Sequence, residues 1–405
     1  MSRKLDASLK KIDKVFDKMF LKSISVKGEI DGEPKRYSKN SIQTYKDMMY
    51  SMMRTVHEEF GISDIRKVED KHIREIVEKR VDGYFDGKLG ESWNVKTMLS
   101  AIKSFNLGVE KTNVFNSNKF AIADVDAIKK ELRKENVYRY SKSSGIMRAT
   151  PAECDFVLDQ IKNTGYMTGT REMAYHVSKI ARHTGGRITA ILNLTTNDIT
   201  ITDNKITFVG DKGGLTRSVE VDTDTAKYLE SLKEGKGDGH DLFTAKRKNG
   251  QFKKKSTLRK EIERVVKDAG SSLTRMENVI VKDRNGNKKV VAVEKKFTPH
   301  AFRKGYALER IQYYIKKYPT MTKMDDYVKE RIKEDSKIKQ KLDVARERMN
   351  KDRKEKKDLS LEEYAIFFCS VDLGHFRNSV VKDFYSDLEE VLEYYNESKI
   401  DETKK

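Results

Sequence analysis

The first third of the chain carries apolar residues at helical spacing in several separate stretches. Between positions 41 and 60 they recur every three or four residues, and Gly61 follows as a typical helix-ending glycine. The same spacing predicts further helices around residues 73–77, 95–105 and 125–132. Together these elements predict a compact helical domain over residues 38–138, whose lysines face either DNA or solvent.

Polar, Lys-rich segments border this domain on both sides. Residues 1–37 are interpreted as a basic N-terminal segment, either a DNA-binding arm or a tail, with apolar positions for one helix through Ile12 and Phe16. Residues 139–148 are basic and lack apolar spacing, which predicts an exposed linker. We therefore expect separate domains rather than one continuous core.

After the linker, the pattern changes from helical spacing to strand spacing and back. The start of a helix is indicated by an N-cap residue, a first-turn proline and a capping-box acid, at Thr150, Pro151 and Glu153. Residues 198–222 alternate between polar and apolar as strands do, and residues 277–293 predict a second hairpin with a tight turn at Asn285-Gly286. From Pro299 onward the pattern is helical again, so residues 149–405 are expected to form a second domain.

A dense charge run interrupts this second domain at about residues 317–359. Its thin apolar trace predicts a solvated helical insertion, and contact with a partner or with DNA is the alternative. Ser360 and Glu363 then have capping-box spacing and open an apolar helix that leads to Leu373. The predicted fold class is mainly α with a small antiparallel β-sheet, that is α+β.

The charge balance adds a partner to this picture. The 405 residues include 83 Lys plus Arg and 64 Asp plus Glu, so the formal net charge is 83 − 64 = +19, which favours a polyanion such as nucleic acid. We find no apolar run of about 18 residues and no signal-type segment, so no membrane partner is expected and the protein is expected in the cytoplasm. Cys154 and Cys369 have no Cys or His at ligand spacing, which predicts neither a disulfide framework nor a metal site.

The residues with chemical potential occur in five short motifs. In chain order the motifs supply Arg187 after HTGG, Lys212 in VGDKGG, His300 and Arg303 in TPHAFRKG, His375 in LGH, and Tyr385 in KDFYSD. Each alone has an ordinary structural explanation, such as an ion pair, a satisfied histidine or a turn, and only the ordered combination is specific. The chain lacks a GxxxxGK[ST] nucleotide loop and a carboxylate cluster of two-metal type, so no cofactor is expected.

This order resembles the tyrosine recombinase, or phage integrase, family, in which Arg, Lys, His-x-x-Arg, His or Trp, and Tyr follow one another. The resemblance covers nearly the whole chain: residues 38–138 look like the family's core-binding domain and residues 149–405 like its catalytic domain. The chain departs from many relatives at Gly186, Lys304 and Asp387, and its interval from the second arginine to the LGH motif is unusually long.

The resemblance implies a role for each candidate residue. Tyr385 would attack the phosphorus, and the two arginines would stabilise the charge on the non-bridging oxygens. His300 would accept or orient the phenol proton, because a phenol with a pKa of about 10 is a poor nucleophile when neutral. Lys212 would protonate the departing 5′ oxygen, and His375 would hydrogen-bond the phosphate.

The resemblance also implies a reaction and partners. It predicts metal- and ATP-independent recombination of double-stranded DNA sites through a 3′-phosphotyrosine and a four-way junction, in a homotetramer, with possible DNA-bending or directionality factors. The basic N-terminal segment and the insertion favour a mobile-element integrase or transposon recombinase at the nucleoid, and a plasmid resolvase or a chromosome-dimer resolution enzyme remains open. The segment after Tyr385, including Val391, is expected to dock on the next protomer.

Two other functions remain open at this point. A catalytically silent DNA-binding protein would bind a specific sequence and form no covalent complex. A type IB-like topoisomerase would relax supercoiled DNA with little sequence preference.

Overall fold

The computed structural model separates into two compact units. It describes residues 3–391 apart from residues 27–28, 31–32, 35–36, 89, 117–119, 136–145, 166–168, 201–203, 212–214, 283–286, 351–354, 377 and 385–390. The helical unit comprises residues 1–144 and 277–293, and the larger unit comprises residues 145–276 and 294–405. Each unit has its own cluster of buried apolar side chains.

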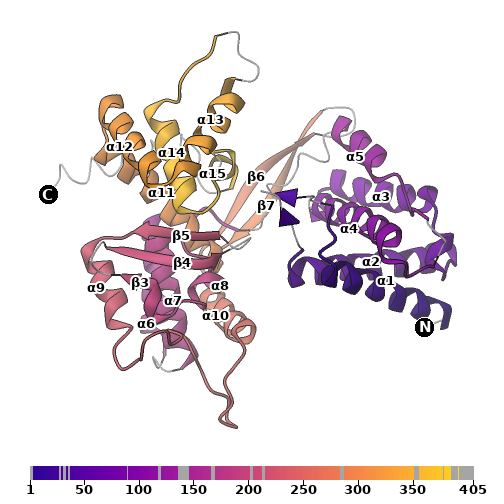
Figure 1. The fold of residues 1–405 in the computed structure, drawn as a ribbon, viewed down its shortest axis with the longest axis horizontal. Helices are drawn as coiled ribbons and strands as arrows, with labels where there is room; N and C mark the ends of the chain where they lie inside the picture. Colours follow the sequence, from indigo (N-terminus) through magenta and orange to yellow (C-terminus); the bar gives the residue numbers. More distant parts are fainter. Residues whose placement is uncertain are drawn as a thin grey trace. The chain divides into compact units, whose positions relative to one another are not determined.

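The helical unit is an assembly of packed α-helices (Figure 1). Its helices are α1 (Arg3–Leu21), α2 (Lys39–Phe60), α3 (Asp70–Phe85), α4 (Gly90–Thr112) and α5 (Val125–Lys134), with a 3₁₀ turn η1 (Ile65–Lys67) and a small β1 (Glu29–Ile30) and β2 (Glu33–Pro34) pair. The four helices expected after residue 38 are confirmed. At the end of α2, Gly61 has a φ of 68° and donates its N–H to the His57 carbonyl at 3.0 Å, as a left-handed cap does.

Helix α1 belongs to the core of the helical unit. Ile12, Phe16 and Met19 are buried against α2 and α4. Ser8 Oγ donates to the Ser63 carbonyl at 2.8 Å and accepts from Ile65 N at 3.1 Å. The segment that was interpreted as an arm or a tail therefore begins with the helix that its apolar positions predicted. The apolar residues form one stripe along this helix, and the stripe packs into the core.

The larger unit combines helices with two small sheets. Its helices are α6 (Pro151–Asn163), α7 (Thr170–Thr184), α8 (Ile188–Ile191), α9 (Thr223–Ser231), α10 (Lys255–Ala269), α11 (Pro299–Lys317), α12 (Met321–Glu334), α13 (Ser336–Asn350), α14 (Leu361–Asp372) and α15 (Asn378–Phe384), with a 3₁₀ turn η3 (Thr196–Asp198). Strands β3 (Ile199–Thr200), β4 (Lys205–Asp211) and β5 (Leu215–Glu220) form an antiparallel sheet in that order. The strands expected over residues 198–222 and the mainly helical α+β class are thus confirmed.

Strands β6 (Thr274–Lys282) and β7 (Lys288–Lys296) pair as the expected hairpin, and the end of β6 and the start of β7, within residues 277–293, belong to the helical unit. Val291 and Val293 pack against the buried cluster of that unit, and Lys289 Nζ donates to the Phe85 carbonyl at 3.2 Å. The expected turn at Asn285-Gly286 lies outside the described residues. The hairpin thus contributes residues to both units.

Helices α7, α11 and α14 form the centre of the larger unit. Helix α11 packs against α6, α7 and α14, and the apolar run from Tyr364 to Val371 on α14 is buried throughout. Both expected capping boxes are present, at Thr150 with Glu153 before α6 and at Ser360 with Glu363 before α14. These caps fix where α6 and α14 start, and α14 in turn leads to the LGH motif.

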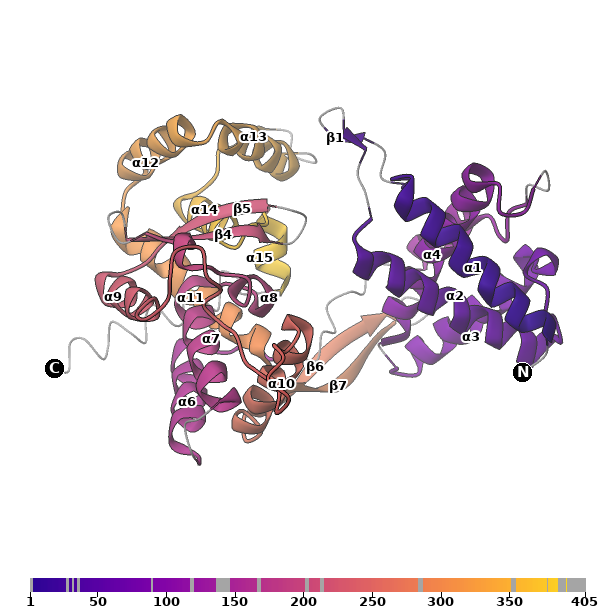
Figure 2. The same ribbon diagram turned by 60° about the horizontal axis from the view of Figure 1, so that its bottom comes forward.

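The charged insertion folds as α12 and α13 and packs on the larger unit (Figure 2). Met324 and Val328 on α12 and Ile338 and Leu342 on α13 are buried, while most of the charged side chains are exposed. The insertion is therefore helical and solvated on its outer faces, as expected, with its thin apolar trace turned inward.

Three further expectations concern residues of the larger unit or the chain as a whole. Cys154 and Cys369 are buried free thiols, and burial raises the pKa of each.

The segment after Tyr385 was expected to dock on the next protomer. Of this segment the structure describes Val391, which is buried within its own larger unit and whose carbonyl accepts from Gln312 Nε2 at 3.4 Å. Residues 388–390 and 392 lie outside the described part. Among the described residues, no helix is both long and apolar enough to cross a membrane.

Candidate active site

The turn between α7 and α8 positions Arg187. Helix α7 ends at Gly185 with a φ of 60°, and a Cβ at that glycine would lie 2.5 Å from the Tyr306 ring and 2.8 Å from a Leu373 methyl. Gly185 is therefore required both by its backbone angle and by the lack of space. Arg187 follows as the N-cap of α8, half-buried, with an extended backbone.

Gly186, a departure from many members of the resembled family, has a local reason here. A Cβ at this position would come 2.9 Å from Ile191 and 3.0 Å from Phe208, both of which are buried. A leucine side chain would not fit without a shift of these neighbours. The departure therefore follows from packing around the turn and leaves Arg187 in place.

Arg303 is held in the middle of the larger unit. It lies in the first turns of α11 and is 1% exposed. Its guanidinium donates to the Gly185 carbonyl through Nη1 and to the Leu373 carbonyl through Nη2. One buried cation thus joins the C-terminal ends of α7 and α14, because a guanidinium is a planar fork that can serve several acceptors at once.

His375 joins the two arginines. It follows Gly374, which has a φ of 69°, and its own N–H donates to the Ser370 carbonyl at 2.8 Å. His375 Nε2 lies 3.4 Å from Arg187 Nη2 and 3.3 Å from Arg303 Nη2. Guanidinium groups only donate, so these contacts require a neutral imidazole with its lone pair at Nε2.

His300 completes the described part of the site. It is half-buried in the first turn of α11 and lines a cavity of about 190 Å³ together with Arg187 and Arg303. Arg259 and Glu263 of α10 line the same cavity and form an ion pair at 2.7 Å. The lining includes three arginines and the Glu263 carboxylate, so its charge is positive on balance, and the start of α11 lies beside it, an arrangement suited to an anion.

Asp372 anchors the end of α14 that leads to His375. Arg310 Nε lies 2.6 Å from Asp372 Oδ2, and Tyr314 donates its hydroxyl to the same oxygen at 2.8 Å. Arg217 of β5 donates to the Asp372 carbonyl, and its guanidinium lies 4.4 Å from the centre of the Phe208 ring. Side chains of α11 and β5 therefore fix the position from which His375 projects.

The structure thus brings together Arg187, His300, Arg303 and His375, which are spread over 189 positions of sequence (375 − 187 + 1). Lys212 and Tyr385 lie outside the described residues, and in the chain they directly follow β4 and α15. Within the described residues no group of three or more His, Cys, Asp or Glu side chains is placed to hold a metal ion.

The sequence did not indicate Arg259. It lies four residues before Glu263 on an amphipathic helix, a spacing that is typical of a surface ion pair. The only available signal was this spacing, and it does not distinguish a cavity wall from a solvated face. Its approach to the site depends on how α10 packs on α7 and α8.

No family model and no curated protein sequence matches the chain. Solved structures similar to it include the Tn1549 transposon integrase in complex with transposon right end DNA, with 12% identity, 96% of this chain and 99% of that chain covered, and a TM-score of 0.46. The XerH site-specific recombinase bound to palindromic difH substrate has 17% identity, 68% and 69% covered and a TM-score of 0.37. The XerA recombinase has 15% identity, 74% and 83% covered and a TM-score of 0.27. All three are named as recombinases or integrases, and at these identities and TM-scores the roles of the residues in this chain rest on the site itself.

Proposed function

We propose that this protein is a site-specific DNA recombinase that cuts and rejoins strands through a covalent bond to Tyr385. The observation that carries the proposal is that the guanidinium groups of Arg187 and Arg303 both lie within 3.4 Å of His375 Nε2. His300 lines the cavity beside them. These residues come from three motifs far apart in the sequence. Their convergence would supply the hydrogen-bond donors that a bound phosphodiester needs.

The chemistry of the site suits a phosphate in the transition state. The non-bridging oxygens gain negative charge as the phosphorus becomes five-coordinate, and two guanidinium groups would stabilise that charge preferentially. His375, presented as a neutral ring, could donate from its other nitrogen or rotate to face the phosphate. The burial of Arg303 means that its charge is already oriented before DNA arrives.

The proposed reaction balances without metal or ATP. The Tyr385 oxygen forms a bond to phosphorus as the bond from phosphorus to the 5′ oxygen breaks, and the phenol proton passes to His300. Lys212 gives a proton to the departing 5′ oxygen. A 5′ hydroxyl of a second strand then attacks the phosphotyrosine and releases the tyrosine, so that no net bond energy is lost.

The proposal includes an assembly on DNA. A homotetramer on two double-stranded sites would exchange strands through a four-way junction, in the manner of mobile-element integrases and transposon recombinases. The net charge of +19 supports association with DNA.

The test uses a DNA site selected by binding from a random-sequence library, with a nick that lets the cleaved fragment diffuse away. We expect wild type to form a protein–DNA band that survives denaturation, in EDTA and without ATP, and we expect Tyr385→Phe to form none. Binding without a covalent band in wild type would instead establish the catalytically silent DNA-binding protein. Relaxation of plasmids that lack the selected site would establish the topoisomerase.

A further inference from the structure

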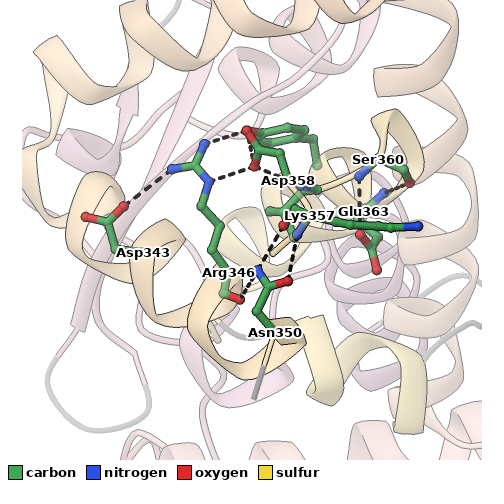
Figure 3. A network of polar contacts seen from close by, with 9 residues as sticks. Asp343, Arg346, Asn350, Lys357, Asp358, Ser360 and Glu363 are labelled. Carbon is green, nitrogen blue, oxygen red and sulfur yellow. Dashed lines mark hydrogen bonds and ion pairs between the residues drawn. The ribbon is translucent and has the colours of Figure 1, made fainter. Parts of the chain in front are cut away.

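The α12–α13 insertion is joined to the start of α14 by a polar network (Figure 3). Arg346 of α13 donates from Nε to Asp358 Oδ1 at 2.8 Å and from Nη2 to the Tyr364 hydroxyl at 2.6 Å. Tyr364 also donates to Asp358 Oδ1 at 3.3 Å. The guanidinium therefore holds one residue before α14 and one residue on it.

Asn350, the last residue of α13, strengthens this junction. Its Nδ2 donates to the Lys357 carbonyl at 2.8 Å, and its Oδ1 accepts from Lys357 N at 2.8 Å. Because both polar groups of one amide side chain pair with the backbone of one residue, the chain at Lys357 is held in position and orientation on α13. This backbone leads within three residues to Ser360, the N-cap of α14.

Glu363 connects that cap to the segment that follows His375. Its Oε2 accepts from Ser360 N at 3.2 Å in the capping box, while its Oε1 lies 3.5 Å from Lys382 Nζ on α15. The Glu363 carbonyl accepts from Asn378 Nδ2, also on α15, at 3.1 Å. One residue thus ties the first turn of α14 to both ends of α15.

A cavity of about 220 Å³ shows how closely α13 approaches the same segment. Its walls include Val344 and Met349 of α13 on one side and Phe376, Asn378 and Lys382 on the other. Asn378 Oδ1 is buried and has no hydrogen-bond partner among the described residues, so α15 is not fully satisfied by its own polar contacts. Side chains of α13 and of the segment around α15 therefore line the same cavity, next to the contacts that α15 makes with α14.

We propose that the α12–α13 insertion acts as a brace that positions the nucleophile, and that Glu363 is the positioning residue through which it acts. The inference rests on the proposed function, since Tyr385 is the residue directly after α15. In this arrangement α13 holds the backbone before α14, the capping box holds Glu363, and Glu363 holds α15 through Lys382 and Asn378. Nucleophile placement within about 1 Å can change a rate by roughly a hundredfold, so such a brace would be felt in the chemical step.

The test compares Glu363→Gln with Glu362→Gln in the full-length protein. Glutamine at the third helical position preserves the capping box, so Glu363→Gln removes mainly the charge that faces Lys382. Glu362 is the neighbouring acid on the same turn; it is hydrogen-bonded to Ser360 Oγ at 2.6 Å and has no polar contact with α15 among the described side chains. We expect Glu363→Gln to lower the rate of covalent complex formation about tenfold at unchanged DNA affinity, and Glu362→Gln to match wild type.

Two further readouts separate positioning from a purely structural role. Lys382→Met should lower the rate by a similar factor, and the double variant should be no slower than either single one, because both act through one contact. A DNA substrate in which sulfur replaces the 5′ leaving oxygen needs no general acid, because the sulfur departs as a thiolate without a proton. On this substrate the slower cleavage of Glu363→Gln should persist, whereas cleavage by Lys212→Ala should be restored. If the loss of rate in the double variant equals the product of the losses in the two single variants, the inference is overturned.

Hydrogen exchange tests the same inference without depending on catalysis. Backbone amides of residues 378–384 should exchange faster in Glu363→Gln than in wild type and Glu362→Gln. Unchanged exchange at these amides overturns the positioning inference alone, whatever the cleavage rates. A wild-type protein that never forms a covalent complex overturns the proposed function, whatever the exchange rates.

Discussion

The two ends of the candidate site are held by different kinds of contact. Arg303 is 1% exposed and bonded to main-chain carbonyls at the ends of α7 and α14. The α15 end depends on Glu363 and Lys382, whose side chains are 22% and 38% exposed. A buried cation on backbone acceptors has few alternative positions, whereas a partly solvated pair is weak and easily rearranged. The Arg303 end of the site is therefore fixed by the fold, while the contacts at the α15 end, which the proposed nucleophile follows in the chain, can rearrange more easily.

The largest effect on stability and on cleavage should come from removing the side chain of Arg303. Arg303→Ala leaves the Gly185 and Leu373 carbonyls buried without their donor, which should lower the free energy of unfolding by roughly 3 kcal/mol or more. Thermal unfolding measures this loss, and covalent complex formation should fall below detection. A variant with wild-type stability would contradict the view that this arginine organises the fold around the site.

Arg187→Ala should separate chemistry from stability. Arg187 is half-buried, and its guanidinium contacts the His375 side chain, whereas that of Arg303 joins the main-chain ends of two helices. Its loss should therefore lower the free energy of unfolding by only about 1 kcal/mol. The cleavage rate should still fall by roughly 10²- to 10³-fold, because one donor to the transition state is gone. Single-turnover cleavage at saturating protein measures the loss of rate, and a melting curve measures the loss of stability. Equal losses of stability in Arg187→Ala and Arg303→Ala would mean that the two arginines are held in the same way.

A matched pair of glycine variants tests how rigidly the turn before Arg187 is held. Gly185 and Gly61 both cap helices with positive φ, but a Cβ meets Tyr306 and Leu373 only at Gly185 and finds nothing within 4 Å at Gly61. Gly61→Ala should cost about 1–2 kcal/mol from the backbone angle, and Gly185→Ala should cost more than that because of the clash. Denaturant unfolding of the two variants gives the difference. Similar values would mean that the turn before Arg187 adapts easily.

Local signals in the sequence predicted much of this fold. Capping boxes at Thr150 and Ser360 and the glycine after α2 act within one helical turn, so residue types alone indicate them. The family resemblance that the order of motifs carries also implied that Arg187, Arg303 and His375 would meet. The structure places them together, whereas Lys212 and Tyr385 remain predictions.

Other features could not be predicted, because they depend on how distant elements pack. Glu363 was recognised as a capping residue, but its ion pair with Lys382 exists only because the chain turns back after α14. Arg259 likewise reaches the cavity only through the packing of α10. Helix α1 was expected from its apolar positions, but its place in the core of the helical unit could not be predicted, because that place depends on its packing against α2 and α4.

The hairpin of β6 and β7 has a consequence for modularity. Residues 277–293 are part of the helical unit, although they lie in the sequence between α10 and α11 of the larger unit. Neither unit is therefore one continuous stretch of chain, and a fragment that ends at residue 144 lacks Val291 and Val293, which pack on its core. Exchange of a whole unit between relatives by a single crossover would leave both products incomplete. Each unit is therefore expected to fold best when it is expressed as part of the full-length chain.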